Sequence, residues 1–273
     1  MSKVLVVTSG KGGVGKTTTT AALGAALAQR GDKVVVVDFD VGLRNLDLVM
    51  GAERRVLFDL INVVQGVAKL PQALIRDKRL ENLWLLPASQ TRDKDALTEE
   101  GVGKVIDDLR GRFDWVICDS PAGIERGASM AMRFADEAVI VTNPEVSSVR
   151  DSDRIIGLLD AKTAKAERGE RMEKHLLLTR YDANRAERGD MLKVDDVLEI
   201  LSIPLLGIVP ESMDVLRASN IGAPVTLAES RSPAAMAYFD AARRLAGELV
   251  PMAIPEEKRN IFGKIFGRRA ASK

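Results

Sequence analysis

The feature that most constrains this chain is a glycine-rich loop between an apolar run and a stretch of helical composition near the amino terminus. The run Val4–Val7 predicts a buried strand, and Lys16–Arg30 has the composition of a helix. Residues 10–18 have the sequence G-K-G-G-V-G-K-T-T, which satisfies the spacing of a phosphate-binding loop in the required strand–loop–helix order. The sequence therefore predicts an α/β P-loop NTPase fold.

The loop is expected to contact phosphates through its backbone and its last residues. Glycines let successive backbone N–H groups turn toward phosphate oxygens, and a helix that begins at Lys16 directs the positive end of its dipole toward them. We expect Lys16 to reach the β- and γ-phosphates, the Thr17 hydroxyl to bind Mg²⁺, and Thr18 to contact the α-phosphate. The sequence N-K-x-D, which recognises guanine, is absent, so ATP is favoured over GTP. The predicted nucleotide-binding residues of the loop are Gly10, Lys11, Gly12, Gly13, Val14, Gly15, Lys16, Thr17 and Thr18.

Two further apolar runs end in acidic residues. Val34–Val37 precedes Asp38 and Asp40, and Trp115–Cys118 precedes Asp119. Ligands of open α/β sheets bind beyond the carboxyl ends of the strands, so these carboxylates are expected beside the nucleotide. We predict that Asp119 belongs to the Mg²⁺ shell through a water molecule, that Asp40 orients the attacking water, and that Asp38 holds either the same loop or the lysine end. The residues alone do not rank Asp38 against Asp40.

Short apolar runs alternate with helical stretches along most of the chain. Most runs are continuous rather than alternating in polarity, as expected for strands buried on both faces. This order predicts a mostly parallel sheet with helices on both faces, in one ATPase domain over residues 1–250. The other predicted strands are Leu83–Leu86, Ala138–Val141, Leu176–Leu178 and Leu205–Val209, and the other predicted helices are Thr98–Arg110, Ser152–Lys165 and Met191–Leu201.

Composition restricts the class of partner and the compartment. The 273 residues include 40 basic and 39 acidic side chains, so the formal charge of +1 provides no field for nucleic-acid binding. The one cysteine, Cys118, can form neither an internal disulfide nor a cysteine metal site, which favours a reducing compartment. No apolar run reaches the roughly 18 residues of a membrane span and no signal-peptide pattern is present, so we expect a cytoplasmic protein unless a docking segment holds it elsewhere. The one histidine, His175, is interpreted as a surface residue.

The carboxyl-terminal residues differ in composition from the rest of the chain. Pro251 and Pro255 bracket a linker, and residues 256–273 carry six basic and two acidic side chains. Four apolar side chains in this segment recur at i, i+1, i+4 and i+5, which places them on one face of a helix. Residues 251–273 are therefore predicted to be a linker and an amphipathic tail that binds an anionic membrane surface. The predicted membrane-contacting residues are Ile261, Phe262, Ile265 and Phe266.

A second lysine inside the loop indicates a family. The phosphate cradle does not need Lys11, and the sequence K-G-G-V-G-K-T-T resembles the deviant Walker A loop of the MinD/ParA family of P-loop ATPases. In that family the first lysine reaches the partner's nucleotide across a dimer interface, and the resemblance implies this role for Lys11. It also favours Asp40 for orienting the water and implies adenine contacts at Thr179-Arg180 and Pro210-Glu211. The other segments that carry the resemblance are Asp38–Asp47, Pro87–Ala96, Cys118–Glu125, Asn143–Arg154, Leu176–Tyr181 and Leu216–Asn220.

The resemblance implies a slow, partner-stimulated ATPase that dimerises with ATP, lies on the cytoplasmic face of the inner membrane and positions the division septum. The implied partners are the division inhibitor MinC, which is recruited, and MinE, which stimulates hydrolysis and releases the protein. Both would use the surface near Val149–Arg154. A ParA-type DNA-partitioning ATPase is the alternative, but it needs a basic DNA-binding surface, and no specific nucleic acid is expected. A nitrogenase iron protein needs paired cysteines, and a small-molecule kinase would leave Lys11 and the tail without a role.

Overall fold

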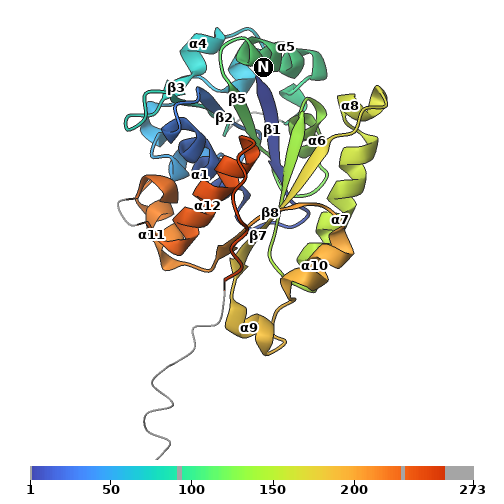
Figure 1. Cartoon of the computed structure of the whole chain (residues 1–273). Helices are drawn as coiled ribbons and strands as arrows, with labels where there is room; N and C mark the ends of the chain where they lie inside the picture. Colours follow the sequence, from blue (N-terminus) through green and yellow to red (C-terminus); the bar gives the residue numbers. More distant parts are fainter. Residues whose placement is uncertain (1, 91–93, 229–230, 256–273) are drawn as a thin grey trace, which may run out of the picture.

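The computed structural model describes residues 2–90, 94–228 and 231–255. Its centre is an eight-stranded sheet with the strand order β3-β4-β2-β5-β1-β6-β7-β8 (Figure 1). All neighbouring strands are parallel except β3, which pairs antiparallel with β4 at one edge. The predicted mostly parallel α/β sheet is therefore confirmed. The strands are β1 Lys3–Thr8, β2 Val34–Asp38, β3 Ile75–Arg76, β4 Leu83–Leu86, β5 Trp115–Asp119, β6 Glu137–Thr142, β7 Glu173–Tyr181 and β8 Leu205–Pro210.

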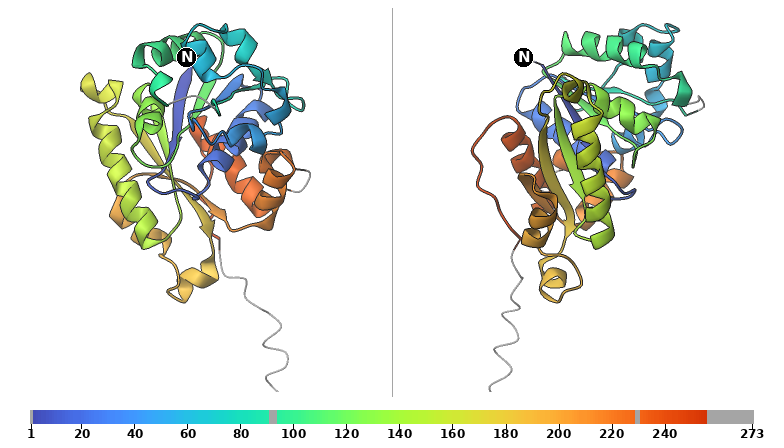
Figure 2. Two further views of the ribbon diagram at one scale, coloured as in Figure 1. Left: turned by 180° about the vertical axis from the view of Figure 1, so that it is seen from behind. Right: turned by 90° about the vertical axis from the view of Figure 1, so that its right-hand side faces the viewer.

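Helices cover both faces of the sheet (Figure 2). Helices α1 Lys16–Gln29 and α12 Pro233–Leu245 pack on one face, and α5 Glu99–Arg110 and α7 Val146–Ala161 pack on the other. The other helices are α2 Leu46–Val49, α3 Leu60–Val64, α4 Leu70–Ala73, α6 Arg126–Arg133, α8 Ala164–Glu167, α9 Ala183–Glu187, α10 Val194–Leu201 and α11 Met213–Asn220, and 3₁₀ turns span Glu53–Arg55, Lys94–Ala96 and Val225–Leu227.

The continuous apolar runs arise because each central strand contributes to two cores. Val34 and Val36 of β2 lie in the core beneath α1 and α12, whereas Val35 and Val37 lie in the core beneath α5 and α7. Helix α1 lies so close to β2 that a Cβ atom on Gly24 would come within 2.7 Å of a Val36 methyl carbon. This packing fixes the start of α1 relative to the central strands.

The helix predicted over Ser152–Lys165 was wrong at both ends. Helix α7 begins at Val146, because Glu145 is extended and Val149 already packs against the sheet. It ends at Ala161, and Thr163 then caps the separate helix α8. The helical segment that follows β6 therefore starts much closer to the end of that strand than the sequence suggested.

Two other predicted boundaries also differ. Strand β7 is longer than the predicted Leu176–Leu178, because the residues before Leu176 pair with β6. Helix α10 begins at Val194 rather than Met191, because Lys193 is extended and its backbone N–H donates to the Asp196 side chain. The two-residue strand β3 was not predicted.

The length and polarity of the helices within residues 2–90, 94–228 and 231–255 bear on whether this part of the chain can cross a membrane. None of the helices within these residues is long and apolar enough to cross a bilayer. The described chain ends in residues 251–255, which have no regular secondary structure. The predicted tail residues Ile261, Phe262, Ile265 and Phe266 lie outside the described residues.

Candidate nucleotide-binding site

The phosphate loop joins the end of the central strand β1 to the first turn of α1. Gly13, with φ 77°, and Gly15, with φ 101°, adopt the left-handed backbone that favours glycine, and Gly15 precedes the first helical residue. A Cβ atom on Gly10 would lie 2.2 Å from backbone atoms of Asp151 in α7. The loop therefore needs glycine both for its turns and for its close approach to α7.

Lys16 is the first residue of α1 and is nearly buried, with 8% of its surface exposed. Its Nζ donates a hydrogen bond of 2.8 Å to Ser9 Oγ, which in turn donates to the Lys11 carbonyl oxygen at 2.7 Å. Burial lowers the pKa of Lys16, while the charges of Asp119 and Asp40 act to raise it. An ammonium group that is already buried can bind phosphate oxygens at little further desolvation cost.

Two buried carboxylates lie side by side where β2 and β5 end. Asp38 and Asp119 are register partners in the sheet and are 0% and 1% exposed. Asp38 accepts hydrogen bonds from the backbone N–H groups of Asp40 at 2.8 Å and Leu46 at 3.2 Å. Burial raises the pKa of Asp38 well above its usual range, and the charge of Asp119 adds to this. Asp38 therefore shapes the loop that presents Asp40.

Asp119 faces the hydroxyl groups of the first turns of α1. Thr20 Oγ1 donates to Asp119 Oδ1 at 3.1 Å, and the Thr17 side chain also forms a hydrogen bond with this carboxylate. Burial raises the pKa of Asp119, although Thr17, Lys16 and Thr20 act in the opposite direction. The Thr17 hydroxyl and the Asp119 carboxylate are hard oxygen donors of the kind that Mg²⁺ prefers, so the residues fit this ion.

Two cavities meet at the loop. The first has a volume of 530 Å³ and is lined by loop residues together with Asp40. The second has a volume of 460 Å³ and is lined by residues at and just beyond the carboxyl ends of β7 and β8, including Pro210 and Glu211. Arg180 lines both cavities and has a φ of 54°, a strained conformation for a residue other than glycine. The first cavity suits phosphates, and the second suits a base beside the two loops to which adenine contacts were assigned.

The structure distinguishes the two acidic residues that the sequence left unranked. Asp40 is half-buried and lines the first cavity with Lys16 and Thr17. Asp38 is fully buried and accepts backbone hydrogen bonds. The geometry therefore favours Asp40 as the group that meets a water molecule.

Lys11 is held at the start of α7 within its own chain. Its Nζ donates to Glu145 Oε2 and to Ser147 Oγ, both at 3.1 Å. The hydrogen bond from Lys11 is the main reason that the pKa of Glu145 is lowered. Both side chains are more than two-fifths exposed, so the ion pair contributes at most about 1 kcal/mol. Lys11 can therefore leave Glu145 at little cost.

Sequence reasoning missed several residues of the site. Ser9 and Thr20 contact Lys16 and Asp119, and the spacing of Thr20 three residues after Thr17 on one helix was a usable signal. Tyr238 of α12 lines the second cavity and carried no local signal, because it is brought there by the packing of α12 on α1.

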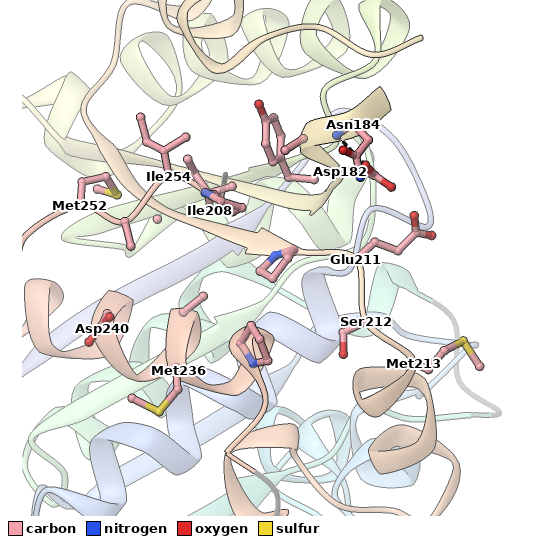
Figure 3. Close-up of a pocket in the computed structure, with 18 of the residues that line it drawn as sticks. Asp182, Asn184, Ile208, Glu211, Ser212, Met213, Met236, Asp240, Met252 and Ile254 are labelled. Carbon is pink, nitrogen blue, oxygen red and sulfur yellow. Dashed lines mark hydrogen bonds between the residues drawn. The ribbon is translucent and has the colours of Figure 1, made fainter. Parts of the chain in front are cut away.

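A third cavity of 730 Å³ lies along β8, α12 and the last described residues (Figure 3). Figure 3 shows the side chains of Ile208, Met236 and Ile254 around it. The loop formed by residues 210–213 lines both this cavity and the second one. Arg244 of α12 donates to two backbone carbonyl oxygens of the last segment. The described chain therefore ends beside the loops that border the second cavity.

Comparison with known proteins gives matches over nearly the whole chain. Residues 5–225 match the model of the CobQ/CobB/MinD/ParA nucleotide binding domain. The chain is 62% identical over 270 residues to the septum site-determining protein MinD of Escherichia coli K12, covering 98% of this chain and 100% of that protein.

Two solved structures from other organisms are also similar. The MinC:MinD cell division protein complex of Aquifex aeolicus has 42% identity and a TM-score of 0.83, covering 93% of this chain and 99% of that one. The MinD of Pyrococcus horikoshii complexed with Mg-ADP has 32% identity and a TM-score of 0.79, covering 90% and 96%. The chain belongs to the MinD family of septum site-determining cell division ATPases, within the larger group of MinD/ParA nucleotide-binding proteins.

Proposed function

We propose that this protein binds ATP with Mg²⁺, dimerises on the inner membrane, recruits MinC and is released when MinE stimulates hydrolysis. The observation that carries the proposal is the buried Lys16 beside Asp119, at a glycine loop in a chain of the MinD family. Residues 1–250 act as the ATPase domain, and residues 251–273 act as the linker and the membrane-targeting tail. In hydrolysis the water oxygen bonds to the γ-phosphorus, and the bond between the γ-phosphorus and the oxygen that bridges to the β-phosphate breaks. One proton of the water is released, and the products are ADP and phosphate.

Each residue of the site takes a role that its chemistry allows. Lys16 and the loop N–H groups bind the phosphates, and Thr17 and Asp119 hold Mg²⁺, which offsets phosphate charge when bound. Asp40 orients the attacking water, because it lines the phosphate cavity. Arg180 and Pro210 line the second cavity and bind adenine. The MinD of Pyrococcus horikoshii was solved with Mg-ADP, which supports this choice of ligand.

Lys11 acts across the dimer interface. A cation supplied by the partner neutralises charge that develops on the transferred phosphoryl group, and this couples hydrolysis to dimerisation. To act in this way, Lys11 must leave Glu145 and Ser147, and their exposed position makes the exchange inexpensive.

MinC and MinE act through α7. The Aquifex aeolicus MinD was solved in a complex with MinC, which supports MinC as a partner. Helix α7 contacts the phosphate loop directly, because Asp151 lies against Gly10 and Glu145 binds Lys11. A partner bound on α7 is thus in mechanical contact with the nucleotide loop.

A single tail binds the membrane surface weakly, and the two tails of a dimer bind it firmly. Burial of two Phe and two Ile side chains supplies about 6–12 kcal/mol at roughly 1.5–3 kcal/mol each, and basic residues add about 1 kcal/mol each near anionic lipid. Ordering about ten residues removes most of this gain, at about 1–2 kcal/mol per residue. In a dimer the second tail binds intramolecularly once the first has bound, so the membrane affinity of the dimer is much higher than that of one chain. The four apolar residues are Ile261, Phe262, Ile265 and Phe266.

Sedimentation with anionic phospholipid vesicles tests the proposal. The intact protein should pellet with ATP and stay in solution with ADP or without nucleotide. Lys16→Ala should stay in solution in all three conditions, whereas Lys69→Ala, a change at an exposed lysine away from the site, should behave as the intact protein. A chain that ends at Pro255 should bind ATP and fail to pellet.

Two outcomes would contradict parts of the proposal. Equal pelleting with ATP, with ADP and without nucleotide would remove the coupling between nucleotide and membrane. If the chain that ends at Pro255 also pelleted with the vesicles, the tail would not be the segment that binds the membrane. The alternative, a ParA-type DNA-partitioning ATPase, is tested by replacing the vesicles with duplex DNA, to which ATP-dependent binding is not expected at a net charge of +1.

A further inference from the structure

The amino ends of β6 and β7 hold a group of metal-ligand side chains, at the end of the sheet opposite the nucleotide loop. Glu137, Glu173 and His175 each offer one ligand atom, and these atoms all lie within 4.8 Å of one another. Glu137 and Glu173 are register partners, and His175 follows two residues after Glu173, which places it on the same face of β7. We propose that Glu137, Glu173 and His175 bind a divalent transition-metal ion of the zinc class.

The distance between two of the ligand atoms suits a shared metal ion better than a hydrogen bond. His175 Nε2 lies 3.4 Å from Glu137 Oε2, beyond the about 2.7–3.2 Å of an N–H···O hydrogen bond. Nε2 is buried and has no hydrogen-bond partner among the described residues. Ligand atoms of a tetrahedral zinc site, with bonds of about 2.0–2.1 Å, lie about 3.3 Å apart. A cation between these two atoms would satisfy both.

The charges around Glu137 also favour a cation. Glu137 is 7% exposed and lies opposite a second carboxylate, a like-charge pair that is unfavourable on neighbouring strands. Lys3 Nζ donates to Glu137 Oε1 at 2.6 Å, which leaves Oε2 facing His175. Lys3 pairs with Glu137, whereas Glu173 has no lysine or arginine ion-pair partner among the described residues.

The remaining ligand has room to adjust, and the position is accessible. Glu173 is exposed, and together with His175 it lines a cavity of 880 Å³. Three protein ligands of oxygen and nitrogen leave a fourth position for water, as in many zinc sites, and the hydrogen bond from Lys3 would orient the Glu137 carboxylate. His175, which the sequence suggested to be a surface residue, is partly buried, with 22% of its side chain exposed.

Metal titration of the full chain tests this site directly. The protein is freed of divalent cations with a chelator and titrated with Zn²⁺, and separately with Co²⁺, without nucleotide. Because the chain has one histidine, its imidazole resonances need no assignment and should shift until a single equivalent of Zn²⁺ is bound. Co²⁺ should give the visible absorption bands of a four-coordinate ion. Imidazole resonances that do not move at stoichiometric Zn²⁺ would overturn the proposal.

Matched variants show whether the binding occurs at these side chains. His175→Gln and Glu137→Gln should weaken Zn²⁺ binding by more than about tenfold, since loss of even an outer-shell partner has an effect of about tenfold to hundredfold. Glu170→Gln, at an exposed carboxylate on the same cavity, should leave the affinity unchanged. If Glu137→Gln does not fold, Glu173→Gln at the exposed ligand makes the same test. Equal Zn²⁺ affinity in the ligand variants and in Glu170→Gln would assign the ion to another place and overturn the proposal.

Discussion

The two ends of the parallel sheet hold carboxylates in opposite ways. At the carboxyl end, Asp38 and Asp119 are surrounded by hydroxyl and backbone N–H donors, and burial raises the pKa of each. At the amino end, Asp136 accepts hydrogen bonds from Arg110 at 2.7 Å and from the Val4 backbone at 2.8 Å. The next residue, Glu137, pairs with Lys3, and the pKa of the Glu137 carboxyl is lowered.

The difference lies in where the compensating positive charge comes from. At the amino end Arg110 compensates Asp136 and Lys3 compensates Glu137, so these two acidic residues stabilise the fold. At the carboxyl end Lys16 is the nearby cation that acts on Asp119, and the compensation is incomplete. An enzyme can maintain such an unfavourable arrangement where a ligand completes it. The comparison therefore predicts opposite responses when the charges at the two ends are changed.

The largest expected effect is the loss of hydrolysis in Lys16→Ala. Removing a positioned donor that stabilises developing charge lowers the rate by about a hundredfold to a thousandfold. Phosphate release in the presence of anionic vesicles measures this, with Lys69→Ala as the control at an exposed lysine. A rate within a few-fold of the unaltered protein would mean that the carboxyl end of the sheet is not the site of catalysis.

The same substitution at the two ends should have opposite effects on stability. Asp136→Asn replaces a carboxylate that binds Arg110 and the β1 backbone, so it should lower the free energy of unfolding by about 1–2 kcal/mol and leave hydrolysis unchanged. Asp119→Asn removes a buried carboxyl whose ionised form is poorly compensated, so it should keep or raise the free energy of unfolding and lower hydrolysis by no more than Lys16→Ala does. Urea unfolding without nucleotide, together with phosphate release, measures both. Similar stability losses in the two variants would break the comparison.

Proton release on nucleotide binding sharpens the comparison. Below the ordinary aspartate pKa of about 3.9, the carboxyl groups of Asp38 and Asp119 are protonated in both the folded and the unfolded chain. As the pH rises above this value, the two carboxyl groups lose their protons first in the unfolded chain, because burial raises their pKa values in the folded chain. The folded state therefore becomes progressively less stable until the pH exceeds the folded-state pKa values. Binding of Mg²⁺ and ATP favours ionised Asp119, so the stabilisation by Mg·ATP should grow with pH near neutrality, by at most about 1.4 kcal/mol per pH unit for each proton.

Calorimetry of Mg·ATP binding in two buffers of different ionisation enthalpy measures this release. Protons contributed by ATP itself are common to every protein variant, so Asp119→Asn serves as the control and should release fewer protons. Equal proton release by Asp119→Asn and the unaltered protein would show that Asp119 does not titrate with binding.

The features that could be predicted from sequence are those encoded by consecutive residues. The strand, the glycine loop and the start of α1 follow one another, so their chemistry is visible in a single segment, Val4–Thr18. The acidic residues at the ends of β2 and β5 were also visible, because continuous apolar runs mark buried parallel strands. Parallel packing then brings Asp38 and Asp119 into register, as the structure has them.

The features that could not be predicted depend on contacts between distant residues. Lys11 and Glu145 are 134 positions apart, and no local pattern indicates that they meet. The ranking of Asp38 and Asp40 depends on how the loop after β2 folds back on the Asp38 side chain. The burial of His175 Nε2 depends on Glu137 in the neighbouring strand. These contacts arise from the packing of segments that are distant in sequence, so the local sequence pattern does not reveal them.

The smallest expected effect concerns the contact that joins α12 to α1 beside the base cavity. Tyr238 is 2% exposed, and its hydroxyl lies 3.2 Å from Thr19 Oγ1. Burial raises the pKa of Tyr238 to about 12, so the hydroxyl stays neutral and the contact is a neutral hydrogen bond. Tyr238→Phe should therefore lower the free energy of unfolding by about 0.5–1.5 kcal/mol and weaken ATP binding by less than Lys16→Ala does.

Urea unfolding of Tyr238→Phe, with the chain's other tyrosine changed in Tyr181→Phe as the control, measures this contact. Tyr238 belongs to the ligand-binding end of the sheet, yet its hydrogen bond is complete within the chain. If Tyr238→Phe lowers the free energy of unfolding and Asp119→Asn does not, the instability of this end is confined to its uncompensated charges. If both variants are destabilised alike, the carboxyl end is an ordinary part of the fold, and its carboxylates do not depend on a ligand for compensation.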